Sequence, residues 1–118
     1  MNVPKSKSGK AKNDRPSRIS RSRIEAMIAE ATVDCYNDSE QSGGLFNMME
    51  ENLILPFKTS VLGVDVIVEK LDISPGDEIV AVCRRDRHRV RIPILDLPLP
   101  QKRPAGAEWI EAYRYWSR

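Results

Sequence analysis

The spacing of the apolar residues changes at Pro56, and this change is the strongest constraint on the fold. Before Pro56, residues 24–35 place apolar side chains three and four positions apart, which indicates one buried face of an α-helix. After Pro56 the period falls to two, which indicates strands with one buried face. Helices followed by several short strands predict an α+β domain.

Two helices are predicted ahead of the strands. Ser20 is a suitable N-cap for the first helix, which is expected to run from residue 21 to about residue 41. The Ser-Gly-Gly segment at residues 42–44 predicts the end of that helix. A second, shorter helix is predicted over residues 45–52, and Pro56 closes it. The N-terminal part is therefore expected to be a helix pair joined by a glycine turn.

Four strands with short turns are predicted after Pro56. Their expected bounds are residues 57–62, 64–71, 78–84 and 88–94. Closely connected strands of this kind favour an antiparallel meander that curls into a small SH3-like barrel. A final helix is predicted over residues 107–116. Its apolar face is expected to cover the core with Trp109, Ile110, Tyr113 and Trp116.

The charge is distributed unevenly along the 118 residues. The net charge of +2 combines +7 in residues 1–23, with eight Lys and Arg against one Asp, and −5 in residues 24–118, with eleven against sixteen. Residues 1–18 are basic and poor in apolar side chains, so this tail is expected to be disordered. Residues 19–118 are expected to form a single domain.

Residues 24–57 contain no Lys or Arg. Their seven carboxylates are Glu25, Glu30, Asp34, Asp38, Glu40, Glu50 and Glu51. On a helix that runs to residue 41, Glu30, Asp34 and Asp38 would form a stripe of like charges that repel one another. Asp38 and Glu40 would lie in its last turn, where the helix dipole disfavours negative charge. A solvated helix face explains most charge stripes, but a bound cation would relieve both costs.

Calcium is the cation that this composition favours. Several hard oxygen ligands in a flexible arrangement suit calcium better than zinc or magnesium, and the DxDxDG order of an EF-hand loop is absent. The predicted ligands are Asp34, Asp38 and Glu40, joined by Glu50 or Glu51 from the second helix. Two further acidic groups are candidates: Asp65, Glu69, Asp72, Asp77 and Glu78 for a second ion, and Glu108 with Glu111 as another location.

Several segments resemble the small calcium-binding proteins described from cyanobacteria. The similar segments are residues 30–36 (EATVDCY), 40–43 (EQSG), 49–53 (MEENL), 55–57 (LPF), 61–63 (VLG), 94–100 (ILDLPLP) and 106–113 (GAEWIEAY), the last being the most distinctive. The resemblance covers residue 24 to the end. It implies an intracellular protein that binds calcium through acidic surface residues outside any EF-hand, and we expect it to act as a calcium buffer or sensor. It does not assign individual ligands, and the basic tail departs from the family pattern.

A second hypothesis concerns the arginine-rich segment at residues 84–91. Arg87, Arg89 and Arg91 would share one face of a strand, and together with the basic tail they could bind nucleic acid, weakly and without sequence specificity. The simpler interpretation, which we favour, is an edge strand protected by charge and paired with acids on its neighbour. A small SH3-like barrel that binds nucleic acid is therefore the alternative to calcium binding.

Other function classes have little support in the sequence. Cys35 and Cys83 are far apart and the chain has one histidine, so free buried thiols in a reducing cytoplasm are expected and a structural zinc site is not. The apolar runs are too short to span a bilayer, so no membrane partner is expected. No phosphate loop, HExxH or catalytic triad appears, so an enzyme is not expected. A protein partner is left open.

Overall fold

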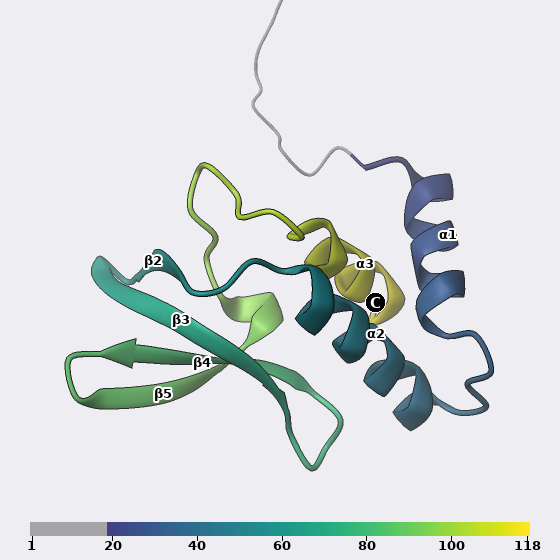
Figure 1. Cartoon of the computed structure of the whole chain (residues 1–118), viewed down its shortest axis with the longest axis horizontal. Coiled ribbons are helices and arrows are strands. Elements are labelled where there is room, and N and C mark those ends of the chain that lie inside the picture. The colour runs from purple at the N-terminus through teal and green to yellow at the C-terminus, as the bar shows by residue number, and fades with distance from the viewer. Residues whose placement is uncertain (1–18) are drawn as a thin grey trace, which may run out of the picture.

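The structure is a computed structural model, and it describes residues 19–118. The expected basic tail, residues 1–18, lies outside the described residues. The elements in chain order are α1 (Arg21–Ala31), α2 (Asp38–Asn52), β2 (Phe57–Val61), β3 (Val64–Ile73), β4 (Ile79–Arg85), β5 (His88–Pro93), the 3-10 turn η1 (Ile94–Asp96) and α3 (Glu108–Trp116). The predicted α+β order of a helix pair, four strands and a C-terminal helix is confirmed (Figure 1).

The four strands form an antiparallel meander in the order β2-β3-β4-β5, with a register shift between Val68 and Lys70. The predicted closure into a barrel is not confirmed, because among the described residues β2 and β5 are the two edges and do not pair with each other. The helices gather at one end of the sheet, while the β2–β3 and β4–β5 turns lie at the opposite end (Figure 1). The molecule therefore has a helical end and a hairpin end.

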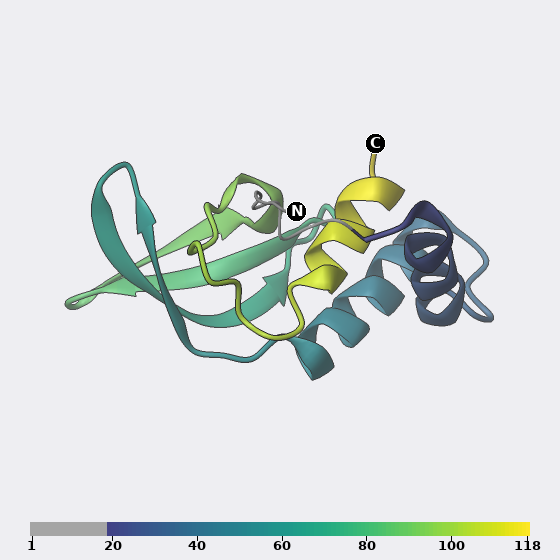
Figure 2. The same ribbon diagram turned by 90° about the horizontal axis from the view of Figure 1, so that it is seen from above.

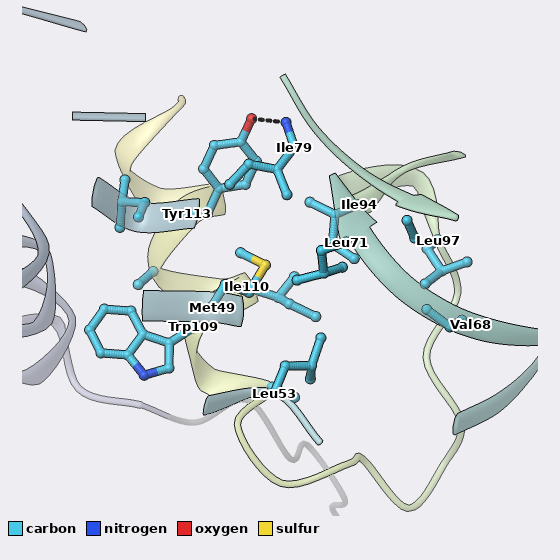
Figure 3. Close-up of a cluster of buried hydrophobic side chains, with 14 of the residues drawn as sticks. Met49, Leu53, Val68, Leu71, Ile79, Ile94, Leu97, Trp109, Ile110 and Tyr113 are labelled. Carbon is cyan, nitrogen blue, oxygen red and sulfur yellow. Dashed lines mark hydrogen bonds between the residues drawn. The ribbon is translucent and has the colours of Figure 1, made fainter. Parts of the chain in front are cut away.

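The core lies between the sheet and the helices α2 and α3. Alternate residues of β4, Ile79, Ala81 and Cys83, face this core and are fully buried. They meet Met49 of α2 and Ile110 of α3, which are also buried (Figure 3). A hydrogen bond from the Ile79 backbone N–H to the Tyr113 hydroxyl, 3.3 Å long, joins the sheet to α3. The prediction that the C-terminal aromatic residues cover the core is confirmed.

The predicted helix boundaries before Pro56 are wrong. The first helix ends at Ala31, and the Gly43-Gly44 pair lies inside α2. The reason is packing between the two helices: a Cβ at Gly44 would collide with the backbone carbonyl of Ala31, so α1 can cross α2 at this point only over a glycine. The glycine that suggested a turn is instead a contact point between helices.

The first two helices are separated by the loop 32–37, which ends at Asn37, the N-cap of α2. The Asn37 side chain accepts a hydrogen bond from the Glu40 backbone N–H (2.8 Å), and the Glu40 carboxylate accepts one from the Tyr36 backbone N–H (2.8 Å). This reciprocal pair resembles a capping box and explains why α2 begins at Asp38. Asp38 and Glu40 therefore lie in the first turn of α2, where the helix dipole stabilises negative charge.

Candidate metal centre

The seven carboxylates of residues 24–57 are all exposed in the structure. Within residues 19–118, none of them forms a salt bridge. Glu25 accepts a hydrogen bond from the Tyr115 hydroxyl (2.8 Å), and Glu40 is held by the Tyr36 N–H, but neither contact brings a positive charge. This part of the surface keeps a charge of −7 without an internal counter-charge.

One group of these acids surrounds the loop between the first two helices. Glu30 lies in the last turn of α1, Asp34 in the loop with a left-handed backbone (φ 62°), and Asp38 and Glu40 at the start of α2. The predicted stripe of Glu30, Asp34 and Asp38 along one helix does not exist, because α1 ends before Asp34. The loop still brings these acids into one stretch of chain around a helix C-terminus and a helix N-terminus.

Glu50 and Glu51 lie apart from the loop, in the last turn of α2. Ten residues of α-helix separate Glu40 from Glu50, a rise of about 15 Å along the axis. The predicted set of five ligands is therefore divided between two places that one ion cannot bridge. The helix dipole disfavours negative charge at this end of α2, where the last turn carries two acids and no basic residue.

The described residues have suitable chemistry for calcium but no completed shell. Within residues 19–118, no three Asp, Glu, His or Cys side chains converge closely enough to hold an ion. Calcium takes six to eight oxygen ligands and accepts carboxylates, carbonyls and water in flexible geometry. The exposed carboxylates near the loop and at the end of α2 fit a calcium ion that obtains part of its shell from water or from backbone carbonyls.

The second predicted acidic group is not a cluster. Glu69 is paired with Arg84 (2.6 Å) and Arg89 (2.9 Å), and Asp72 is paired with Arg91 (2.8 Å). Hydrogen bonds from Arg89 and Arg84 hold the pKa of Glu69 below its ordinary value of 4.5. The predicted edge strand balanced by acids is confirmed, since β5 is an edge of the sheet, but the acids that pair with Arg89 and Arg91 lie on β3, beyond the neighbouring strand β4.

The remaining predicted acids lie in different surroundings, and Asp65 and Glu78 are exposed without a salt bridge within residues 19–118. Glu111 forms a salt bridge with Arg103 (2.8 Å), so its carboxylate is not free to bind an ion at the alternative location predicted with Glu108. Glu108 lines a surface pocket of about 300 Å³ beside Arg103. Asp77 lies in the β3–β4 turn, where its carbonyl accepts a hydrogen bond from the buried Ser42 hydroxyl (2.6 Å). Sequence reasoning missed this role of Ser42, whose only signal is its place in α2 beside the two glycines.

The Glu69 pairs predict a specific dependence of stability on pH. Because the folded pKa is lowered, the charged pairs stabilise the fold fully above the ordinary pKa of 4.5, and this stabilisation disappears as the pH falls through the lowered value. Glu69→Gln is therefore expected to melt below wild type at neutral pH and together with it in acid. Glu51→Gln, which removes an acid outside these pairs, is the control. A pH-independent difference would contradict a role of the charge.

The two cysteines differ in their surroundings. Both are free thiols; Cys83 is buried in the core and Cys35 is half-buried. Burial raises the pKa of the Cys83 thiol, so this side chain behaves as part of the apolar core. The expectation of buried free thiols is confirmed for Cys83 and only partly for Cys35.

No helix in the described part of the chain is both long and apolar enough to cross a membrane.

Comparison with known proteins gives one match. A family model described as calcium binding, of the CcbP type, matches residues 22–117, which is nearly the whole of the described chain. No curated protein and no solved structure gives a match. The match includes both acidic groups, the sheet and α3, so it applies to the fold as a unit.

Proposed function

Since the chain belongs to the CcbP type of calcium-binding protein family, we propose that it is a non-enzymatic calcium buffer or sensor of the cytoplasm. Its ligands are exposed carboxylates of α1, α2 and the loop between them, without an EF-hand loop. The observation that carries this proposal is the contrast between two acidic surfaces. Glu69 and Asp72 of the sheet are neutralised by arginines, whereas within residues 19–118 none of the seven acids of residues 24–57 has a salt bridge.

The uncompensated charge has a physical consequence that a bound cation reverses. Seven like charges on two short helices and one loop repel one another in the absence of a cation. A divalent ion relieves this repulsion and gains carboxylate ligands that are already exposed, without first breaking a salt bridge. The acids paired with Arg84, Arg89 and Arg91 would have to lose those contacts to bind the same ion.

We place the stronger site at the loop between α1 and α2. Asp34 and Asp38 make no side-chain hydrogen bond to a described residue, so both carboxylates are available, and Glu40 has one oxygen besides the one that accepts from Tyr36. Glu50 and Glu51 form a second, separate site at the end of α2, where an ion also offsets the unfavourable dipole. This division replaces the single five-ligand site expected from the sequence.

Isothermal calorimetry on three double variants tests this placement. Asp34→Asn with Asp38→Asn is expected to weaken calcium binding at least tenfold, because two charged ligands become neutral amides. Glu50→Gln with Glu51→Gln is expected to remove a weaker binding event and leave the first. Asp65→Asn with Glu78→Gln changes the net charge equally, and this control should bind as wild type. Loss of binding in the control alone would move the site to the sheet.

Nucleic-acid binding remains a prediction from the sequence, and the salt bridges of the sheet weaken it. Three of the arginines on which it relied, Arg84, Arg89 and Arg91, are engaged by acids of β3. His88 is exposed and belongs to no group of three metal-ligating side chains within the described residues. Calcium binding therefore remains the proposed function, and nucleic-acid binding is kept as the alternative to it.

A further inference from the structure

The turn between β2 and β3 exposes a leucine at the extreme hairpin end of the molecule. Leu62 is 97% exposed, more than any other large apolar side chain of the described residues. Leu62 and Gly63 both have positive φ angles, 52° and 79°, as a two-residue type I′ hairpin turn requires. Asn-Gly is the sequence that such a turn prefers, and a leucine with positive φ is strained. Leu62 therefore costs stability and contributes no packing to the folded chain.

Two further exposed apolar side chains lie on the sheet, one next to this turn and one on the edge strand β5. Val64, the first residue of β3, is 40% exposed, and Val90 of the edge strand β5 is 52% exposed. The helices cover the other end of the sheet and leave this end open (Figure 1). Single exposed apolar residues are ordinary, but a fully exposed leucine on a strained turn, followed by the partly exposed Val64, indicates a contact surface.

Basic side chains accompany the leucine turn. Arg85 and Arg87, at the neighbouring β4–β5 turn, are exposed, and neither forms a salt bridge within residues 19–118. The Arg85 guanidinium donates a hydrogen bond to the Asp65 carbonyl (3.2 Å), which ties the second hairpin to the first. Both turns project from the same end of the sheet (Figure 2). Asp65 and Asp86 are also exposed here and form no salt bridge within residues 19–118, while Arg84 and Arg89 share the one carboxylate of Glu69. The hairpin end thus combines an apolar tip with four arginines (Arg84, Arg85, Arg87 and Arg89) against three acids (Asp65, Glu69 and Asp86).

We propose that this hairpin end docks on the surface of a lipid bilayer that contains anionic lipids. Leu62 enters the boundary between headgroups and acyl chains, and Arg85 and Arg87 contact the anionic headgroups. The acidic loop between α1 and α2 lies at the opposite end and faces away from the bilayer, so this orientation keeps its carboxylates away from the anionic headgroups (Figure 1). A nucleic acid offers phosphates for the arginines but no apolar phase for Leu62, and we therefore favour the bilayer.

This inference goes beyond calcium binding and is independent of it. It also departs from the expectation of no membrane partner, which rested on the absence of a spanning segment. Peripheral docking needs only a short apolar insertion and nearby positive charge. Leu62 and the two arginines provide both without any change in the fold.

Vesicle sedimentation with the full chain tests the role of Leu62. The vesicles contain phosphatidylserine and phosphatidylcholine, and a chelator removes calcium so that the ion cannot bridge acids to headgroups. Leu62→Asn is expected to lower the partition coefficient about tenfold, because the transfer of one leucine side chain is lost. The variant should melt at or above the wild-type temperature, since Asn-Gly suits the turn. Ile54→Asn, at an exposed aliphatic residue outside the sheet, is the matched control.

A second pair of variants tests the role of the arginines. Arg85→Gln with Arg87→Gln should weaken binding to anionic vesicles, while Arg21→Gln with Lys102→Gln, which changes the net charge equally, should weaken it less. The basic residues 1–18 are present in every variant and cancel in the comparison. Equal binding by wild type and Leu62→Asn overturns the proposal. So does equal binding to pure phosphatidylcholine vesicles, or retention on single-stranded DNA without any vesicle binding.

Discussion

Calcium at a hundredfold excess over its dissociation constant is expected to stabilise the folded protein by about 2.7 kcal/mol, because it binds the folded state and not the unfolded one. For a domain of this size, that corresponds to a rise of roughly 10–20 °C in melting temperature. The expectation follows from the seven exposed carboxylates of residues 24–57, which form no salt bridge within the described chain.

Thermal melts in four solutions separate ion binding from simple screening. Chelator defines the reference, and magnesium is expected to raise the melting temperature less than calcium because it resists dehydration and irregular geometry. Sodium chloride at matched ionic strength should recover only the part due to screening of the mutual repulsion. If sodium chloride and calcium give the same rise, the acidic surface is a solvated face and the proposed site is refuted.

Gly44→Ala is expected to destabilise the protein by about 1–3 kcal/mol, the range measured when an extra group is forced into a packed interior. An added Cβ would meet the backbone carbonyl of Ala31, and neither helix can yield without moving the other. The backbone fixes the position of a Cβ, and the atom that it meets is a backbone carbonyl oxygen, so no side-chain rotation relieves the contact. Because the acidic loop connects these two helices, the substitution should also disturb the position of Asp34 relative to Asp38.

The adjacent glycine provides a matched control of opposite sign. A Cβ at Gly43 meets nothing within 4 Å, although the residue lies in the same helix. Gly43→Ala is therefore expected to stabilise the protein by about 0.5–1 kcal/mol through the better helix propensity of alanine. Chemical denaturation of the two variants measures both values. Equal effects of the two substitutions would mean that the close helix crossing does not exist in solution.

Strands and the last helix could be predicted because their signals are local. The period-two pattern, the Ser-Pro-Gly-Asp turn and the apolar face of residues 107–116 placed these elements to within two residues of their observed bounds. Gly44 was misread because the reason for a glycine there is a contact with Ala31, thirteen residues away in the chain. A local signal for α2 did exist, in Asn37 followed three residues later by Glu40, which is a capping pattern.

The acidic character of the candidate site was determined by the sequence alone. Seven carboxylates without a lysine or arginine over residues 24–57 are a property of composition, and no fold changes it. The tertiary structure decided which acids remain available and which lie near one another. It paired Glu69 and Asp72 with arginines of β4 and β5, and it separated Glu40 from Glu50 by the length of α2. The physical reason is that salt bridges and ligand sets depend on contacts between elements, whereas charge and periodicity are carried by each segment itself.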